Sequence, residues 1–358
     1  MNGRAALQRK FSKLPPLYQA HGSTYQADTC RPVTHAMESG QIRYEALSRG
    51  HYPGRPLPET ALAGLCLIGF WDAKHNQQWG LDWHRNEGIE LTFLETGSLV
   101  YACDEQEHHL TAGDLTIARP WQPHRVGGPH VAASRLHFLV LDVGVRRPHQ
   151  AWTWPSWVVL TPGDRKEITR FIRHSEQVVW QATSDVQRCF ERIGRAVETD
   201  GSGSNASLLA AYLNELLVRV LELFRRKEVR LDESLGSTQR TVELFWSELT
   251  HNLEQLGEPW TVTQMARRCG LSTPQFTRLS KRLYNMTPNK HLNHCRVKQA
   301  ARLLVEQPER TVTQIGLSVG FSSSQYFATV FHREIGCSPL TFRTSPGDVK
   351  LRASGRTR

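Results

Sequence analysis

A short segment near the C-terminal end of the chain places polar and basic side chains on one side of a predicted helix. Phe276 and Leu279 are spaced to face a core, so the remaining positions face outward: Thr273, Pro274, Thr277, Arg278 and Lys281. An arginine guanidinium can make two hydrogen bonds to the edge of a guanine, and a lysine ammonium can pair with a phosphate. These residue types at this spacing predict a helix that reads bases in the major groove of DNA.

The elements that would hold this helix occur twice in the sequence. Residues 263–272 align with residues 313–322 at Thr, Gln, an apolar residue, a small residue, Gly, an apolar residue and Ser. After the turn, one extra residue in the second copy shifts the alignment, so that Phe276 matches Phe327. Residues 290–306 have apolar side chains at helical spacing, which predicts a long helix that joins the two copies.

The residues of each copy predict two helices joined by a tight turn. Gly270 can adopt the left-handed backbone that ends the first helix. Ser272 can cap the second helix, with Gln275 completing a capping box. The small residue Ala266, which is Gly316 in the second copy, lets two steeply crossing helices approach closely. The sequence therefore predicts two helix-turn-helix units.

Positive charge is concentrated in the same part of the chain. The formal net charge is +10, and residues 257–345 carry twelve basic against four acidic side chains. A basic run can also be a solvated face, and a duplicated helical hairpin can be a piece of a structural solenoid. Two copies are few for a solenoid and the outward faces are basic, which favours double-stranded DNA as the partner.

The change of hydrophobic period along the chain predicts an α+β protein of several domains. Short alternating apolar runs predict an antiparallel β-barrel or sandwich, and after about residue 157 the period becomes that of helices. The expected parts are an irregular N-terminal arm (1–60) with at most one strand near 42–47, the barrel (61–150), a helical connector and dimerisation region (151–235), an all-α double helix-turn-helix domain (236–345) and a flexible tail (346–358).

The connector contains a wide apolar stripe, formed by Leu209, Leu213, Leu216, Val220 and Leu223. Such a stripe either packs into the core of its own subunit or pairs with a second subunit. Regulators gain affinity by joining two DNA-binding domains, so we expect a homodimer to which this stripe contributes.

The composition argues against several other classes of protein. No stretch approaches the roughly 18 uncharged apolar residues of a membrane span, and residues 1–13 lack the apolar block of a secretory signal. The seven cysteines are scattered and include no C-x-x-C pair, which argues against a disulfide framework or a thiolate zinc site. We therefore expect no contact with a membrane and a cytoplasmic location.

The C-terminal region resembles the DNA-binding domain of the AraC/XylS family of transcription regulators. The resemblance covers roughly residues 241–345 and rests on many positions at the family's separations, among them CGLS (269–272), RVKQAARLL (296–304), VGF (319–321) and GCSP (336–339). It implies a sequence-specific transcription regulator rather than an enzyme, one that works with RNA polymerase. An activator is the expected kind, and whether transcription is raised or lowered stays open at this point.

By this resemblance, two sets of side chains contact DNA. The first unit would use Thr273, Pro274, Thr277, Arg278 and Lys281, and the second would use Ser324, Gln325, Ala328, Thr329 and Arg333. Three positions depart from the family's pattern: Ser280 replaces a buried aromatic residue, Asn285 replaces a glycine, and Thr329 replaces a frequent arginine. Because threonine reads a base less well than arginine, we expect most of the specificity in the first unit.

Members of that family often carry an N-terminal cupin-like barrel that binds a small effector. Residues 90–97, 113–114 and 120–124 resemble the two cupin motifs, which implies effector-binding roles for His84, Glu90, Trp121 and His124. Metal-binding cupins use a further histidine, and Asn86 stands at its position here. We therefore expect an effector domain without a metal or another cofactor. The alternative is a metal-dependent cupin enzyme fused to a DNA-binding module.

The effector expected for the barrel is a small molecule, with a carbohydrate as the candidate class. Eight of the ten tryptophans precede the predicted DNA-binding region, and aromatic faces can stack on sugar rings. Ordinary core packing explains most tryptophans equally well, so the identity of the effector stays open.

Overall fold

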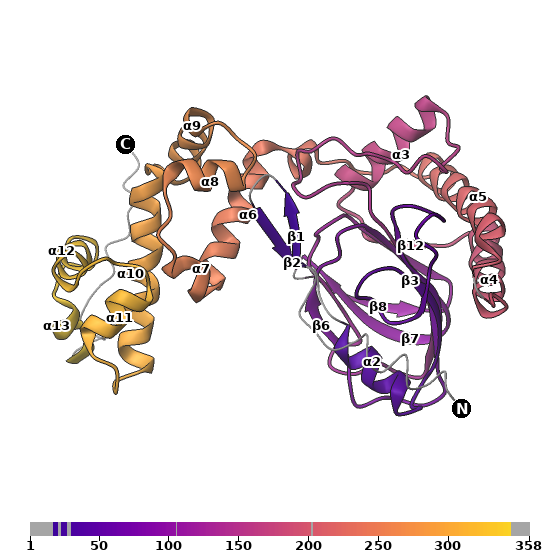
Figure 1. Cartoon of the computed structure of the whole chain (residues 1–358), viewed down its shortest axis with the longest axis horizontal. Coiled ribbons are helices and arrows are strands. Elements are labelled where there is room, and N and C mark those ends of the chain that lie inside the picture. The colour runs from indigo at the N-terminus through magenta and orange to yellow at the C-terminus, as the bar shows by residue number, and fades with distance from the viewer. Residues whose placement is uncertain (1–16, 21–22, 27–29, 105, 202, 345–358) are drawn as a thin grey trace. The chain divides into compact units, whose positions relative to one another are not determined.

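The computed structural model describes residues 17–20, 23–26, 30–104, 106–201 and 203–344, and Figure 1 shows the order of their elements. Contacts divide the chain into two compact units, and the division falls between Gly236 and Ser237. The strands β1 (Leu17–Ala20) and β2 (Ser23–Gln26) form a small two-stranded sheet. The expected tail at 346–358 and residues 1–16 of the expected arm lie outside the described residues.

The first unit is built on a ten-stranded sheet, which confirms the expected cupin-like β fold. Along the main path the strand order is β12-β9-β7-β11-β5-β3-β4, and β6, β8 and β10 pair beside it. The strands are β3 (Arg43–Ser48), β4 (Arg55–Pro56), β5 (Leu65–Ala73), β6 (Leu81–His84), β7 (Ile89–Cys103), β8 (Gln106–Thr111), β9 (Asp114–Ala118), β10 (His124–Val126), β11 (Ser134–Leu141) and β12 (Val179–Gln181).

The long strand β7 joins the two parts of this sheet. Its first half pairs with β9 and β11, and its second half pairs with β8 and β10. Because side chains alternate along a strand, Glu90 and Thr92 lie on one face, which we call the inner face. Ile89, Leu91 and Phe93 lie on the outer face and belong to a core that is shared with helices.

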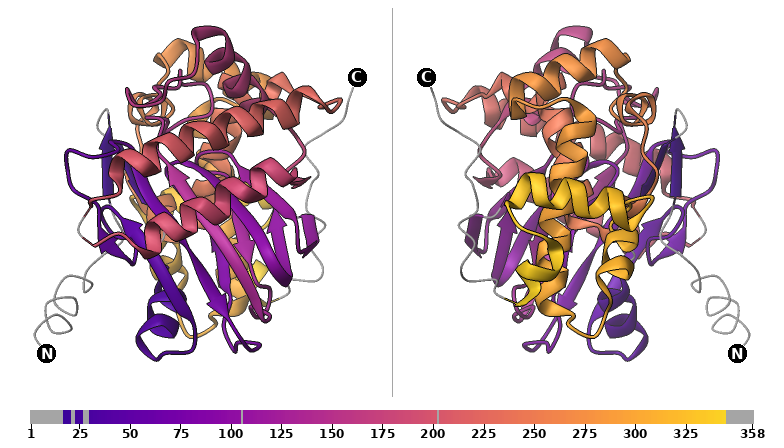
Figure 2. Two further views of the ribbon diagram at one scale, coloured as in Figure 1. Left: turned by 90° about the vertical axis from the view of Figure 1, so that its right-hand side faces the viewer. Right: turned by 90° about the vertical axis from the view of Figure 1, so that its left-hand side faces the viewer.

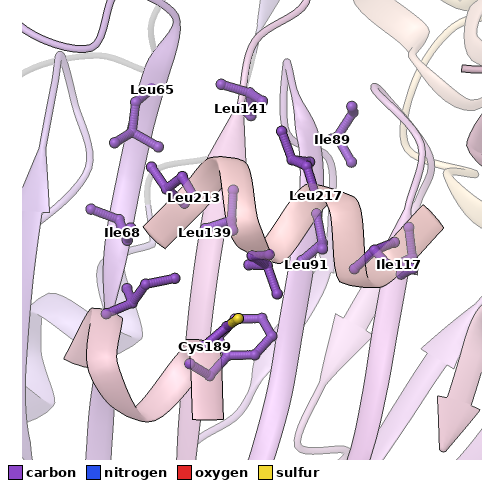
Figure 3. Packing of buried hydrophobic residues seen from close by; sticks show 14 of the residues in the cluster. Leu65, Ile68, Ile89, Leu91, Ile117, Leu139, Leu141, Cys189, Leu213 and Leu217 are labelled. Atoms are coloured by element: carbon purple, nitrogen blue, oxygen red, sulfur yellow. The ribbon is translucent and has the colours of Figure 1, made fainter. Parts of the chain in front are cut away.

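The helices α4 (Ser184–Glu198) and α5 (Ala206–Arg225) lie across the outer face of the sheet, as Figure 2 shows in its left view. The apolar stripe of α5 is buried there, with Leu213 2% and Leu216 0% exposed. Leu213 and Leu217 lie over strand residues such as Leu91 and Leu139 (Figure 3). The prediction that this stripe reaches a second subunit is therefore wrong, because the stripe packs into the core of its own subunit.

The rest of the expected connector also belongs to the first unit. It contains α3 (Pro162–His174) and ends in a short 3-10 helix, η1 (Glu233–Gly236). Between α3 and α4 the chain adds β12 to the sheet, where β12 pairs with β9. These residues do not stand between two domains.

The expected irregular arm contains regular structure, namely the strands β1, β2, β3 and β4 and one helix. The helix α2 (Arg31–Glu38) has Pro32 in its first turn, where the missing N–H of proline breaks no helical hydrogen bond. β3 pairs with β5 along its length, which confirms the strand expected near 42–47. The prediction of an irregular arm with at most one strand was wrong, because four strands and α2 lie in it. For α2, a proline that starts a helix was taken for a sign of loop structure.

The second unit is helical in its described part (Figures 1 and 2). Its buried apolar side chains form two cores. Its helices are α6 (Thr238–His251), α7 (Leu253–Gly257), α8 (Val262–Arg268), α9 (Thr273–Tyr284), α10 (Pro288–Glu306), α11 (Val312–Ser318), α12 (Ser324–Ile335) and α13 (Pro339–Thr344). The long helix α10 contributes Leu292 and Cys295 to the first core and Ala300 and Leu304 to the second. The two pairs α8–α9 and α11–α12 are thus held on one shared helix.

Within the described residues, no helix has the length and apolar character that a membrane span needs.

Candidate nucleic-acid interface and ligand cavity

The turn between α8 and α9 follows the geometry that the sequence predicted. A full capping box between Thr261 and Gln264 starts α8, and Gly270 has a left-handed backbone with φ of 65°. The hydroxyl of Ser272 accepts a hydrogen bond from the backbone N–H of Gln275 at 3.4 Å. This bond is one half of the capping box predicted for Ser272 and Gln275, and the reciprocal bond to the side chain of Gln275 is not seen among the described residues. Asn285 ends α9 with φ of 53°, the left-handed conformation that asparagine tolerates.

The outward face of α9 carries the side chains predicted to meet DNA. Pro274, Arg278 and Lys281 are exposed, whereas Thr273 and Thr277 are half-buried. Phe276 and Leu279 lie on the opposite face and belong to the first core. Among the described residues no ion pair is recorded for Arg278 or Lys281. Both cationic groups are therefore available to an anionic partner.

The second unit repeats this construction with its own N-cap. Thr311 and Gln314 form the capping box of α11, and Ser323 caps α12, which agrees with the one-residue shift of the repeat. A Cβ atom on Gly316 would lie 2.6 Å from the ring of Phe327, so only glycine permits this approach of the two helices. Gly320 forms the turn with φ of 97°.

The outward face of α12 is less suited to reading bases. Gln325 and Thr329 are exposed and Ser324 and Ala328 are half-buried, but the hydroxyl of Thr329 donates to the carbonyl of Gln325 at 3.0 Å. Arg333 is exposed, with its Nε 3.7 Å from Oε1 of Glu334.

One exposed aromatic on this face was not predicted as a contact. Tyr326 is 48% exposed, and its hydroxyl accepts a hydrogen bond from the side chain of Asn293 on α10 at 3.0 Å. Its position next to Gln325 on an outward face was the signal that could have identified it.

A cavity lies on the inner face of the sheet. Strand pairing sets Val140 opposite Glu90 and Phe138 opposite Thr92, so these side chains share one face. Four polar residues line the cavity, namely His84, Asn86, Glu90 and Thr92. Its other walls are aromatic (Tyr44, Tyr52, Trp71, Phe138), aliphatic (Val33, Leu67, Leu81, Val126, Leu136, Val140) and Cys30.

The buried carboxylate of Glu90 is the centre of the polar end of this cavity. Its Oε2 lies 2.8 Å from Nε2 of His124, and the side-chain amide of Asn86 donates to the same oxygen. The carbonyl oxygen of Asn86 lies 3.0 Å from the hydroxyl of Tyr52. Burial pushes the pKa of Glu90 up, but His124, His84 and Asn86 together hold that pKa below its usual value.

In both histidines, a contact with a backbone carbonyl sets the tautomer of the ring. Nδ1 of His84 lies 2.7 Å from the carbonyl oxygen of Asp82, and Nδ1 of His124 lies 2.9 Å from that of Gln122. A carbonyl oxygen only accepts hydrogen bonds, so both Nδ1 atoms carry a proton. Burial, the largest influence, lowers the pKa of His84 to about 4, so this ring is neutral near pH 7 and its Nε2 is an acceptor.

The hydrogen bonds of these side chains bear on whether they could hold a metal ion. His84, Glu90 and His124 offer ligand atoms within 4.8 Å of one another, close enough to surround one ion. However, Oε2 of Glu90 already accepts from Asn86 and lies against His124. Asn86 turns its N–H group, which cannot bind a metal, toward the cluster. The arrangement fits a hydrogen-bonded cluster rather than a metal centre, and we derive no metal-dependent step.

The predicted effector residues are only partly brought together. His84 and Glu90 line the cavity, and His124 contacts Glu90 without lining it. Trp121 is not among the lining residues, and its indole N–H donates to the carbonyl of Val145 at 2.7 Å. Tyr44 and Tyr52 were missed as cavity residues. Tyr44 lies in the strand expected near 42–47 and Tyr52 in the segment expected to be irregular, and neither position shows in the sequence that it faces a cavity.

A strand-built unit with a cavity, combined with two helix-turn-helix units, defines a DNA-binding regulator with a separate sensor domain. Residues 265–345 match the helix-turn-helix domain family, and residues 74–141 match the cupin domain family.

Among known proteins, the chain is similar to the HTH-type transcriptional activator RhaR of Mannheimia succiniciproducens, with 22% identity over 262 residues, 73% of this chain and 86% of the relative. It is 30% identical over 135 residues to the HTH-type transcriptional regulator ArgR of Pseudomonas aeruginosa, 37% of this chain and 40% of that protein. The structure of a regulator with an AraC-type DNA-binding domain from Chromobacterium violaceum is 27% identical, covers 31% of this chain and 96% of its own, and has a TM-score of 0.28.

The chain is a DNA-binding transcription regulator of the AraC type, with an N-terminal cupin domain.

Proposed function

We propose that this regulator binds specific DNA through α9 and α12 and activates transcription when a small effector occupies the cavity of the first unit. The observation that carries the proposal is the pair of helix-turn-helix units on the shared helix α10, each with an exposed polar second helix. The base contacts fall on the residues named above, from Thr273 to Lys281 and from Ser324 to Arg333.

The electrostatic part of this proposal is tested by the salt dependence of DNA binding. Each cation that neutralises a phosphate releases a counterion, so the affinity of the full chain for a duplex falls steeply as salt rises. Lys281→Ala lowers the slope of log affinity against log salt by about one. Arg226→Ala, which removes an exposed arginine of the first unit, is the matched control and leaves the slope unchanged. A duplex affinity that does not change with salt concentration would overturn the proposal.

The first unit acts as a sensor in this proposal and catalyses no reaction. The support is the cluster around Glu90, where Asn86 replaces a metal ligand and donates a hydrogen bond instead. The effector is bound by His84 and Glu90, with His124 holding Glu90 in place. A carbohydrate effector stays a prediction from the sequence.

The proposal includes a homodimer that works with RNA polymerase in the cytoplasm. Two joined DNA-binding units gain affinity through their high effective concentration. The stripe of α5 is buried, so the contact between subunits uses another surface. The outward side of α5 has apolar side chains for it, with Leu208 42% and Val218 40% exposed.

A further inference from the structure

We propose that the effector of this cavity is an uncharged, mainly apolar molecule that carries a hydroxyl group, of the class of a phenol or a small alcohol. The inference rests on the proposed effector function and narrows it to one ligand class. Its basis is the contrast between apolar walls and one small polar end that has no net charge.

The walls of the cavity exclude a ligand that is polar on every side. Ten of the fifteen lining residues are aliphatic or aromatic, including Trp71 and Phe138. A sugar ring carries hydroxyl groups around its whole edge, and most of them would lose water without gaining a partner against these walls. The ligand that fits therefore has an apolar body.

The size of the cavity sets a second limit. The space open to the centre of a water molecule is about 40 Å³. One water needs roughly 10–15 Å³ on this scale, so the cavity holds about three waters before any side chain moves. A molecule of about the size of one aromatic ring is closer to this limit than a sugar with its hydroxyl groups.

The charge of the polar end depends on how His124 and Glu90 face each other. The proton on Nδ1 of His124 is directed at the carbonyl of Gln122. Nε2 of His124 lies 2.8 Å from Oε2 of Glu90 without the alignment of a hydrogen bond, and at this distance a bare nitrogen lone pair would repel the carboxylate, which favours one further proton on the pair. With that proton the pair has no net charge, whichever atom holds it. An ammonium group or a metal ion would add an unbalanced charge to a buried place, whereas a hydroxyl adds none.

Two groups in the cavity call for a hydroxyl specifically. His84 uses Nδ1 on the carbonyl of Asp82, so its Nε2 accepts a hydrogen bond from a ligand. Trp71 is 3% exposed, and its indole N–H has no hydrogen-bond partner among the described residues. A hydroxyl is an uncharged group that can donate to an imidazole and can also accept from an indole.

The test compares four probes by calorimetric titration of the purified full chain: phenol, toluene, benzylamine and glucose. Phenol and toluene have nearly the same size and differ in the hydroxyl. Phenol is expected to bind at least about fivefold more tightly than toluene, the effect of one added hydrogen bond. Weaker binding of benzylamine and glucose is expected than of phenol.

Variants locate this preference within the cavity. His84→Leu should lower the ratio of phenol to toluene affinity, because only the contact with Trp71 then remains for the hydroxyl, and should leave toluene binding intact. His109→Leu removes an exposed histidine of β8 that does not line the cavity, and should leave the ratio unchanged. The comparison of probes on the unmodified chain decides the matter even if His84→Leu fails to fold.

Several results would overturn the ligand class. They are phenol binding no tighter than toluene, tighter binding of benzylamine or glucose, or a stoichiometric metal ion in the purified chain. Effector control is measured separately, as the change in DNA affinity on adding each probe. Preferential phenol binding without any change in DNA affinity would contradict effector control and leave the ligand class standing. A DNA affinity that changes when glucose is added, but not with the other probes, would support effector control and contradict the ligand class.

Discussion

At the scale of single residues, α9 and α12 differ in what they can present to a base. Arg278 is exposed and can make two hydrogen bonds to guanine, whereas the hydroxyl of Thr329 is already directed at Gln325. We expect Arg278→Ala to weaken binding to the preferred duplex by about 1–3 kcal/mol and to relax the preference at one base pair. Thr329→Ala should cost less than about 0.5 kcal/mol.

Fluorescence anisotropy titrations with the preferred duplex and with single-base variants measure both effects. Lys281→Ala is the control for a phosphate contact, because it should weaken binding to all duplexes alike. Equal losses for Thr329→Ala and Arg278→Ala would mean that α12 reads bases through other side chains, of which Tyr326 is the first to examine.

Ser280 is a second residue whose environment makes a measurable prediction. It is 0% exposed, and its hydroxyl has no hydrogen-bond partner among the described residues. A buried polar group without a partner destabilises the folded state, so Ser280→Ala should raise the free energy of unfolding by about 1 kcal/mol. Urea unfolding of the second unit measures this change.

Ser338→Ala is the matched control for Ser280→Ala. The hydroxyl of Ser338 accepts a hydrogen bond from the backbone N–H of Thr341 at 3.1 Å, so its removal should lower stability by about 0.5–2 kcal/mol. A loss of stability in Ser280→Ala as well would mean that this hydroxyl is satisfied in solution.

At the scale of elements, the two sides of α5 have different roles. Leu213 is 2% exposed within the core under α5, and Leu208 is 42% exposed. We expect Leu213→Ala to lower the free energy of unfolding by about 2–5 kcal/mol, the usual cost of a cavity in a core. Leu208→Ala should change it by less than about 0.5 kcal/mol.

Sedimentation shows whether the outward side of α5 joins two subunits. A Leu208→Lys, Val218→Lys double variant should be monomeric and folded if the unmodified chain dimerises there. A dimer that survives this change would have to use another surface. A mild effect of Leu213→Ala on unfolding would contradict the packing of α5 on the sheet.

The helical hairpins were predictable from the sequence because their signals are local. Ser272, Gly270 and Asn285 affect the backbone only within a few residues of their own positions. Their residue types therefore predict the local backbone conformation. The repeat provided the same pattern a second time and so supported the prediction independently. Ser323 caps α12 at the position that the one-residue shift of the repeat predicts.

The surface against which an apolar stripe packs cannot be predicted from neighbouring residues in the sequence. For this reason the prediction that the stripe of α5 contributes to a dimer failed. The spacing of leucines in α5 predicts a helix with one apolar side, but it does not state whether that side meets a sheet or a second subunit. The cavity was hidden for the same reason. Its walls come from β3, β5, β7 and β11, whose pairing brings Tyr44, Trp71 and Phe138 together over nearly a hundred residues of chain.

At the scale of the whole molecule, the two proposed roles fall in different units. The cavity and its polar end lie before Gly236, and the two helix-turn-helix units lie after it, where most of the excess positive charge is found. Ligand binding and DNA binding can therefore be measured and altered separately. The proposal of effector control adds that they are coupled.

The most direct test of this account is a selection of bound duplexes from a random pool by the full chain. Two recognition helices on one shared helix should select two clusters of preferred base pairs, about 10 base pairs apart, on one face of the duplex. One cluster should show a stronger base preference than the other, because the second unit has Thr329 at the position where the first unit has Arg278. A pool without any enriched sequence, or with a single cluster, would contradict the claim that each chain reads two successive segments of the major groove.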